Sequence, residues 1–129
     1  MNFQCKEITT TNNEFLCEIT FSDKKDEGHI EGQKYEEILD SLGQYVMLQR
    51  SYGEDDFDQD YCTVEFSDFE KSGELEGFAI VISKHQFRMD YKGYVVEVDL
   101  DLDNDQTFLM IKDILRKITK DRGHITEIE

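Results

Sequence analysis

Acidic residues between Tyr94 and Phe108 are spaced in a way that could support chemistry. In the segment YVVEVDLDLDNDQTF, aspartate occupies every second position, at Asp99, Asp101, Asp103 and Asp105. Carboxylates at positions one, three and five of a loop are the ligands with which an EF-hand binds calcium. Two carboxyls with different pKa values could instead act as a general acid and a general base. A third possibility is an acidic surface that attracts a positively charged partner.

The calcium interpretation fails at the residues that give an EF-hand loop its geometry. A loop that starts at Asp101 has Gln106 where the turn glycine belongs and Lys112 where the bidentate glutamate belongs. A loop that starts two residues earlier has the wrong residues at the same two positions, Asn104 and Met110. The sequence therefore predicts no metal site in this segment.

A β-strand that leads into a helix explains the aspartate spacing better. Successive side chains of a strand point to opposite faces, so alternate residues share one environment. The pattern predicts an apolar inward row and an acidic outward row. The inward row is Val96, Val98, Leu100 and Leu102, and the outward row is Glu97, Asp99 and Asp101. Asp103 and Gln106 have the spacing of a capping box and are expected to start the helix.

Other residues that could do chemistry do not form a recognisable set. The three histidines are expected in a loop, a turn and the tail, at His29, His85 and His124. The serines lack the G-x-S-x-G context of a nucleophile, and no glycine-rich phosphate loop is present. The three cysteines follow strand-like spacing as small buried hydrophobes, at Cys5, Cys17 and Cys62. We expect a protein that is not an enzyme and that needs no cofactor and no metal.

The charge balance favours a protein partner over a nucleic acid. The chain has 129 residues, which is one domain at its simplest, and 30 acidic against 14 basic residues give it a net charge of −16. Such a chain repels phosphate, so direct binding to DNA or RNA is disfavoured, and a basic protein is the natural partner. The beginning of the sequence lacks the features of a signal peptide, and no stretch has transmembrane length, so we expect a cytoplasmic protein. Alternatively, the excess of acidic residues serves only to keep the protein soluble.

Two segments hold most of the negative charge. Residues Glu54–Glu76 contain ten acids and one base, and residues Glu97–Asp105 contain five acids and no base. Aromatic residues beside such acids could anchor in a pocket of a basic partner, or could instead fold back onto the core. The predicted partner-binding residues are Tyr52, Glu54, Asp55, Asp56, Phe57, Asp58, Asp60, Phe69, Glu70, Glu74, Asp99 and Asp101. Whether the two acidic segments share a face depends on the fold.

The elements that must position these residues indicate an α+β fold. Phe15, Cys17, Ile19 and Phe21 alternate with polar residues as in a half-buried strand, with residues 1–8 as the expected hairpin partner. Residues 34–42 have the spacing of a short helix, and residues 44–52 that of a central strand. A further strand at residues 61–67 and a meander from residue 78 follow. A helix over residues 106–119 ends the pattern, so we expect a mainly antiparallel sheet with this C-terminal helix packed on one face.

From Tyr45 onward, the sequence resembles a family of immunity proteins from bacterial polymorphic toxin systems. The resemblance lies in YVMLQR at Tyr45–Arg50, in YCTVEFSDFEKSGELEGFAIVISKHQFRM at Tyr61–Met89, and in the acidic strand followed by the helix FLMIKDILRKI. It covers about two-thirds of the chain and consists of hydrophobic spacing with a few fixed residues. It departs from the family pattern at Phe69 and at Glu74–Glu76.

The resemblance implies a protein that inhibits by binding. An immunity protein occupies a cognate toxin domain and blocks its active site, and many such toxins are basic nucleases. An acidic inhibitor of a basic toxin gains a faster association rate and mimics the charge of the substrate. The alternative is an acidic DNA mimic, or a regulatory binding protein, without a dedicated toxin partner.

Overall fold

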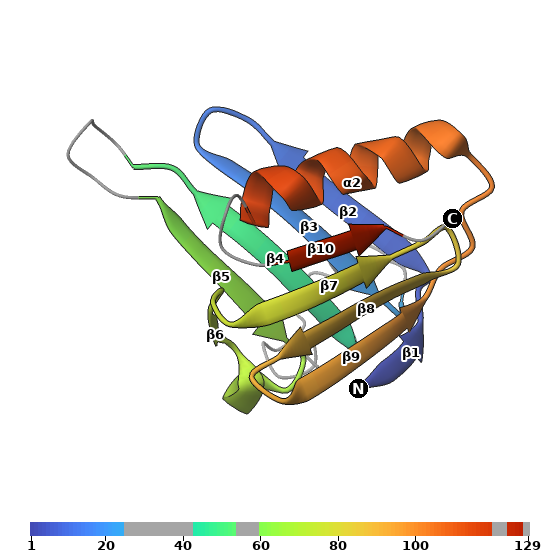
Figure 1. The fold of residues 1–129 in the computed structure, drawn as a ribbon, viewed down its shortest axis with the longest axis horizontal. Helices are drawn as coiled ribbons and strands as arrows, with labels where there is room; N and C mark the ends of the chain where they lie inside the picture. The colour runs from blue at the N-terminus through green and yellow to red at the C-terminus, as the bar shows by residue number, and fades with distance from the viewer. Residues whose placement is uncertain (25–42, 54–59, 120–123, 128–129) are drawn as a thin grey trace, which may run out of the picture.

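The strands that the structure describes form two five-stranded sheets (Figure 1). The computed structural model describes residues 1–24, 43–53, 60–119 and 124–127. The first sheet has the order β2 (Glu7–Asn12), β3 (Leu16–Ser22), β4 (Tyr45–Ser51), β5 (Tyr61–Phe66) and β6 (Gly73–Glu74). The second sheet has the order β1 (Asn2–Gln4), β9 (Tyr94–Asp99), β8 (Gln86–Tyr91), β7 (Phe78–Ile82) and β10 (His124–Glu127). A 3-10 turn, η1 (Phe69–Lys71), and a helix, α2 (Asp105–Thr119), complete the described elements.

Alternation of apolar and polar residues gives the first sheet one buried face. On β3, Cys17, Ile19 and Phe21 are fully buried. The residues between them are half-buried on the other face, as the period of two in a strand requires. β4 lies between β3 and β5, which confirms the predicted central strand. All the pairings within this sheet are antiparallel.

The second sheet combines antiparallel and parallel pairings. β8 pairs antiparallel with both β7 and β9, while β1 and β10 pair in parallel with β9 and β7. A turn at Lys92 and Gly93 joins β8 to β9, with φ angles of 51° and 86°. Positive φ at both central residues is the conformation that matches the twist of a two-residue hairpin, and glycine adopts it without steric cost.

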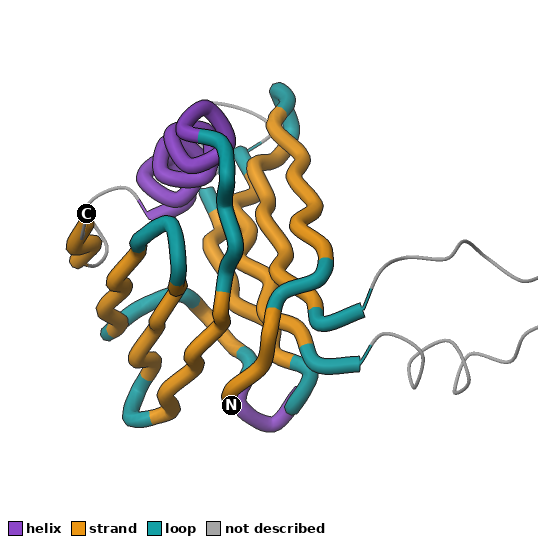
Figure 2. Tube along the Cα trace, turned by 90° about the vertical axis from the view of Figure 1, so that its right-hand side faces the viewer, coloured by secondary structure: helices purple, strands orange, loops and turns teal. Residues whose placement is uncertain are grey.

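The inner face of the first sheet is covered at one end by the second sheet and at the other end by α2. Phe21 of the first sheet stacks on Phe87 of the second, with ring centroids 4.6 Å apart. Towards the other end, the Cys62 thiol lies 3.5 Å from the backbone oxygen of Ile118 in α2. Figure 2 shows the two sheets side by side, with the helix at one end of them. The α+β class predicted from the sequence is therefore correct, but the strands form two sheets where one was expected.

The amino-terminal hairpin was predicted in the wrong register. Residues 1–8 were expected to pair with the strand that contains Cys17, but β2 (Glu7–Asn12) is its partner, and β1 lies in the other sheet. The chain crosses between the sheets at Cys5 and Lys6, whose N–H groups donate to Asp99 and Ser22 (2.8 and 2.7 Å). A period of two does not specify the partner strand, so the pattern fitted both arrangements.

Phe15 was expected to point into the core, but its side chain is 73% exposed. It lies before β3, in a turn in which the Asn13 side-chain oxygen accepts hydrogen bonds from the N–H groups of Phe15 and Leu16 (2.8 and 3.0 Å). Such a turn around a short polar side chain interrupts the alternation of the strand. The predicted helix at residues 34–42 lies outside the described residues.

The carboxy-terminal helix is confirmed, with a different cap. Phe108, Ile111, Leu115 and Ile118 form a buried stripe along the helix. The side-chain oxygen of Asn104, and not that of Asp103, accepts a hydrogen bond from the N–H of Gln106 (2.7 Å). Asn104 is the residue immediately before the first helical residue, and this is the position from which a cap reaches the first-turn N–H groups. In the described part of the chain, no helix is long and apolar enough to cross a membrane.

Candidate partner-binding surface

The predicted partner-binding residues that the structure describes lie in three separate places. Glu54, Asp55, Asp56, Phe57 and Asp58 lie outside the described residues. Tyr52 and Asp60 lie where β4 ends and β5 begins, close to the carboxy-terminal end of α2. Phe69, Glu70 and Glu74 belong to η1 and β6. Asp99 and Asp101 lie at the end of β9 and just beyond it.

Asp60 has a structural role, because its carboxylate is hydrogen-bonded to other residues of the fold. Its carboxylate accepts hydrogen bonds from Arg50 Nε (2.8 Å) and from the N–H of Gly53 (3.2 Å). The Arg50 side chain is only 14% exposed, and its Nη1 also donates to the backbone oxygen of Lys117 at the end of α2 (2.7 Å). Arg50 therefore neutralises much of the Asp60 charge, and the pair ties α2 to the first sheet. This role could not be recognised from the sequence, in which Asp60 is one acid among ten.

Tyr52 is also held in place by its neighbours. Two cations lie close to its ring, with Arg50 Cζ at 5.0 Å and Lys117 Nζ at 5.9 Å from the ring centroid. Its hydroxyl is buried, and no described residue forms a hydrogen bond with it. The packed ring makes Tyr52 less available as an anchor than its neighbourhood in the sequence indicates.

η1, in the first acidic segment, and Asp99, in the second, lie at opposite ends of β9. The Lys71 ammonium of η1 lies 5.8 Å from the ring centroid of Tyr94, the first residue of β9. Asp99 is the last residue of this strand, pairing with Gln4 and Gln86. Each strand residue advances the chain by about 3.3 Å, so the two ends are about 17 Å apart. Glu70 and Asp99 therefore do not form one continuous acidic patch.

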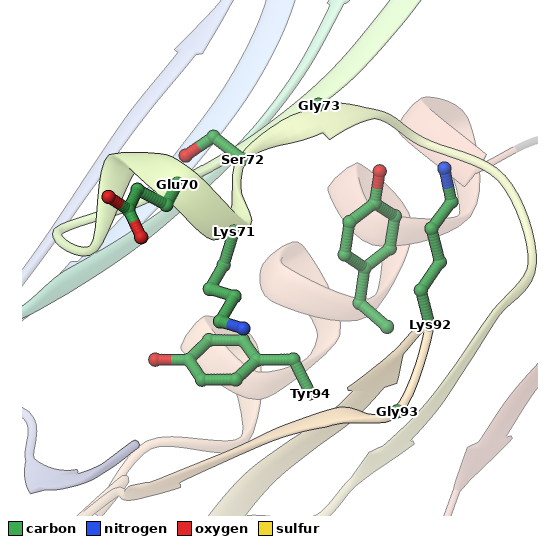
Figure 3. Close-up of a pocket in the computed structure, with 8 residues that line it drawn as sticks. Glu70, Lys71, Ser72, Gly73, Lys92, Gly93 and Tyr94 are labelled. Carbon is green, nitrogen blue, oxygen red and sulfur yellow. The ribbon is translucent and has the colours of Figure 1, made fainter.

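A cavity of about 410 Å³ lies between η1–β6 and the β8–β9 turn (Figure 3). Its lining includes the charged residues Glu70, Lys71 and Lys92 together with the aromatic residues Tyr91 and Tyr94. The Lys92 ammonium already faces the Tyr91 ring at 5.3 Å and the Glu76 carboxylate at 3.5 Å. Burial, and then the charge of Asp68, raise the pKa of the Tyr94 hydroxyl. The cavity could hold a small anionic group, but it lacks an acid–base pair.

Gly73 allows the close approach of strands at this cavity. A Cβ atom at position 73 would lie 3.0 Å from the Tyr91 hydroxyl oxygen. This hydroxyl donates a short hydrogen bond to the backbone oxygen of Glu74. The contact links the edge of the first sheet to β8 of the second, so a larger residue at position 73 would push the two apart.

The outward face of the first sheet carries several acids and no base at the outward positions of its described strands. The register aligns Thr11, Glu18, Gln49, Thr63 and Glu74 in one row, and Thr9, Thr20, Met47 and Glu65 in the next. Tyr61, which is 58% exposed, and Tyr45 flank these rows. We call this surface the acidic sheet face and define it by Glu18, Tyr45, Met47, Tyr61, Glu65 and Glu74.

Hydrogen bonds orient the carboxylates of the acidic sheet face. The Tyr45 hydroxyl donates to Glu65 Oε2 (2.9 Å), and Gln49 Nε2 donates to Glu18 Oε2 (3.0 Å). Side chains held in one rotamer lose less entropy when a partner binds. Of the predicted residues, only Glu74 belongs to this face. The alternation within β3 and β5 indicates the other outward residues, but only the order of the strands shows that they lie together.

The described residues that could act as nucleophiles or metal ligands do not converge. Among them, no three His, Cys, Asp or Glu side chains are grouped so that they could hold a metal ion. Burial raises the pKa of the Cys17 thiol above its usual value, and Lys117 and Arg50 oppose this increase. Burial also raises the pKa of the Cys5 thiol. Because the thiolate is the reactive form, both residues are poor nucleophiles near neutral pH.

No protein-family model matches the sequence, and searches of curated proteins and of solved structures found no match to it. The geometry and charge of the described residues are therefore the basis for a functional proposal.

Proposed function

We propose that this chain is an immunity protein, which acts in the cytoplasm and neutralises a basic toxin domain by binding to it. The observation that carries the proposal is the acidic sheet face, on which Glu18, Glu65 and Glu74 lie without a base at any outward position of the described strands. The resemblance of residues 45–119 to immunity proteins is consistent with this function. No catalytic step is needed for it.

The composition of the acidic sheet face suits a tight protein–protein contact. Tyrosine is enriched among the residues that dominate binding energy, because it buries a large rigid surface and keeps a polar end. Tyr61 and Tyr45 supply such rings, and Met47 supplies an adaptable apolar contact between them. The surrounding carboxylates would accelerate the encounter with a basic surface. Glu70 and the predicted residues Asp55, Asp56 and Asp58 would add to the same long-range attraction.

A charge-reversal experiment tests the proposal. The partner to be tested is the product of the gene immediately upstream, co-expressed with this chain and co-purified. The variant Glu18→Lys/Glu65→Lys should slow association about ten-fold or more and make it less dependent on salt. A matched control, Glu14→Lys/Asp103→Lys, makes the same change in net charge at exposed sites away from the face.

The results separate the proposal from its alternatives. Equal rates for the test and control variants would mean that only net charge matters, and would remove the acidic sheet face from the interface. Failure of the chain to bind the upstream product, or to protect cells that express it, would contradict the immunity function. Binding to a nucleic-acid enzyme instead, in competition with DNA, would favour the acidic DNA mimic.

A further inference from the structure

The strand β2 ends the first sheet and leaves one backbone edge without a described partner strand. The N–H of Asn13 donates to the backbone oxygen of Leu16 (3.0 Å), which fixes the phase of the β2–β3 ladder. Hydrogen-bonded and non-hydrogen-bonded residues alternate in an antiparallel pair. The backbone groups of Ile8, Thr10 and Asn12 therefore point away from β3, towards the open edge.

Among the described residues, β2 lacks the features that usually protect an edge strand. Natural edge strands are blocked by lysine, by proline, by a bulge or by a covering segment. The sequence of β2 is EITTTN, which contains neither lysine nor proline, and its pairing with β3 is continuous over all six residues. A continuous strand with exposed N–H and C=O groups is a template for the addition of another strand.

A groove runs along this edge, between β2 and α2. It has a volume of about 490 Å³, and its lining includes Thr10 and Asn12 of β2 together with Leu109, Met110 and Asp113 of α2. The Leu109 and Met110 side chains are 52% and 42% exposed. Figure 1 shows α2 crossing in front of β2 and β3. The helix therefore presents apolar side chains at the point where the sheet ends.

An added strand would fill this groove. It would lie about 4.8 Å from β2, and the side chains opposite Ile8, Thr10 and Asn12 would share their inward face. That face is the one covered by α2, because Thr10 pairs with the buried Ile19 and Asn12 with the buried Cys17. The inward side chains of the added strand would then cover Leu109 and Met110.

We infer that β2 and this groove bind an extended, basic segment of the partner protein as an additional strand of the first sheet. This inference rests on the proposed function for the partner, and it specifies how that partner is held. The open backbone edge requires an extended chain, and Leu109 and Met110 require apolar residues at alternate positions. Asp113 lines the groove, while the Lys117 ammonium donates to Asn12 Oδ1 at its border (2.8 Å), so basic residues of the segment are attracted by Asp113 and by the net charge of −16. A second copy of this chain carries a charge of −16 and would be repelled.

A peptide experiment tests the inference without knowledge of the toxin. The probe is a six-residue peptide of alternating lysine and valine, and the readout is hydrogen exchange of the backbone amides of Ile8, Thr10 and Asn12. Binding should slow the exchange of these three amides, while those of Thr9 and Thr11 change little. A matched peptide, N-methylated at its valines, cannot donate to β2 in an antiparallel pairing and should bind about ten-fold more weakly or less. A glutamate–valine peptide should also bind more weakly.

Two pairs of variants test the edge and the groove separately. Thr10→Pro removes an N–H that points away from β3, so it should block the peptide and leave the β2–β3 ladder intact. Thr10→Val keeps the N–H and the β-branched shape, and should bind like the parent protein. Leu109→Asp should weaken binding of the lysine–valine peptide, while Leu109→Met should not, and neither change alters a buried side chain.

The possible outcomes are distinguishable from failure of the proposed function. Unchanged exchange at Ile8, Thr10 and Asn12, or equal binding of the N-methylated peptide, would overturn strand addition. Protection of these amides in a dimer of the free protein, seen by sedimentation, would also overturn it, because the occupant would be a second copy. If the upstream product binds equally well to the Thr10→Pro and Thr10→Val variants, the immunity function stands and strand addition is wrong.

Discussion

The inner face of the first sheet is covered in two different ways. At one end, the second sheet contributes aromatic contacts. Phe21 stacks on Phe87, and the ring centroids of Phe66 and Tyr94 lie 5.1 Å apart. At the other end, α2 packs its buried apolar stripe on the sheet and adds a polar contact, in which Arg50 bridges Asp60 and the backbone oxygen of Lys117. Both contacts bury apolar side chains, and the contact with α2 adds hydrogen bonds of fixed geometry.

The difference indicates which contact tolerates changes in conditions and which contact fixes the position of α2 on the sheet. Apolar contacts are not directional and tolerate changes in pH and salt. A guanidinium bound to a carboxylate and a carbonyl fixes one position of the helix relative to the sheet. The acidic sheet face lies opposite both contacts, so its rows of side chains stay aligned only while this inner face stays covered.

The largest effect is expected at the aromatic contact. Phe87→Ala removes a fully buried ring and should lower the free energy of unfolding by about 3–5 kcal/mol. Urea denaturation followed by circular dichroism would measure the change. Phe69→Ala is the control, because the Phe69 side chain is 53% exposed, and it should cost less than about 1 kcal/mol. Similar losses in the two variants would mean that the stack does not hold the sheets together.

A smaller effect is expected at the polar contact. Arg50→Met keeps most of the side-chain volume but removes the donors to Asp60 and Lys117, and should cost about 1–3 kcal/mol. Arg50→Lys keeps the charge without the fork of donors and should recover part of the loss. Thermal unfolding of both variants, alone and with Asp60→Asn, would give the coupling between Arg50 and Asp60. Additive effects would show that the ion pair contributes little to the stability.

The reactivity of the cysteine thiols reports on how well α2 covers the inner face of the first sheet. Cys17 and Cys62 lie on both sides of Arg50 in the register and are almost fully buried, whereas Cys5 is half-buried. In the native protein we expect Cys5 to react first with a disulfide reagent near pH 8, and the other two thiols only on unfolding. Mass spectrometry of the labelled chain would identify the modified residues. Early labelling of Cys62 would show that the helix opens locally.

The sequence predicted the strands and the helix better than their partners. A period of two located β3, β5 and β9, because each of these strands has one buried face, and an apolar run located β4. The same pattern could not show that β1 leaves the first sheet, since a slightly hydrophobic edge strand fits either sheet equally well. Nor could it distinguish Asp60, which binds Arg50, from the acids around it. Charge counts identify an acidic region, but strand order and side-chain contacts decide which acids face a partner.

The smallest effect is expected where α2 begins, at a third contact between the covering elements. Lys84, in the turn between β7 and β8, donates a short hydrogen bond to Asp105, the first residue of the helix. The hydrogen bond and the charge of Lys84 lower the pKa of the Asp105 carboxyl below its usual value of 3.8. A carboxyl whose pKa is lower in the folded protein stabilises the fold above the unfolded pKa, and this stabilisation is lost as the pH falls through the folded pKa.

Lys84→Met should therefore return the pKa of Asp105 towards 3.8, which an NMR titration of the carboxyl carbon would measure. Both side chains are well exposed, so the variant should hardly change the unfolding transition at neutral pH. A marked loss of stability at pH 7 would instead mean that the helix depends on its link to the second sheet as much as on Arg50. In that case the two ways of covering the first sheet would not be independent, and the Phe87→Ala and Arg50→Met losses would not add.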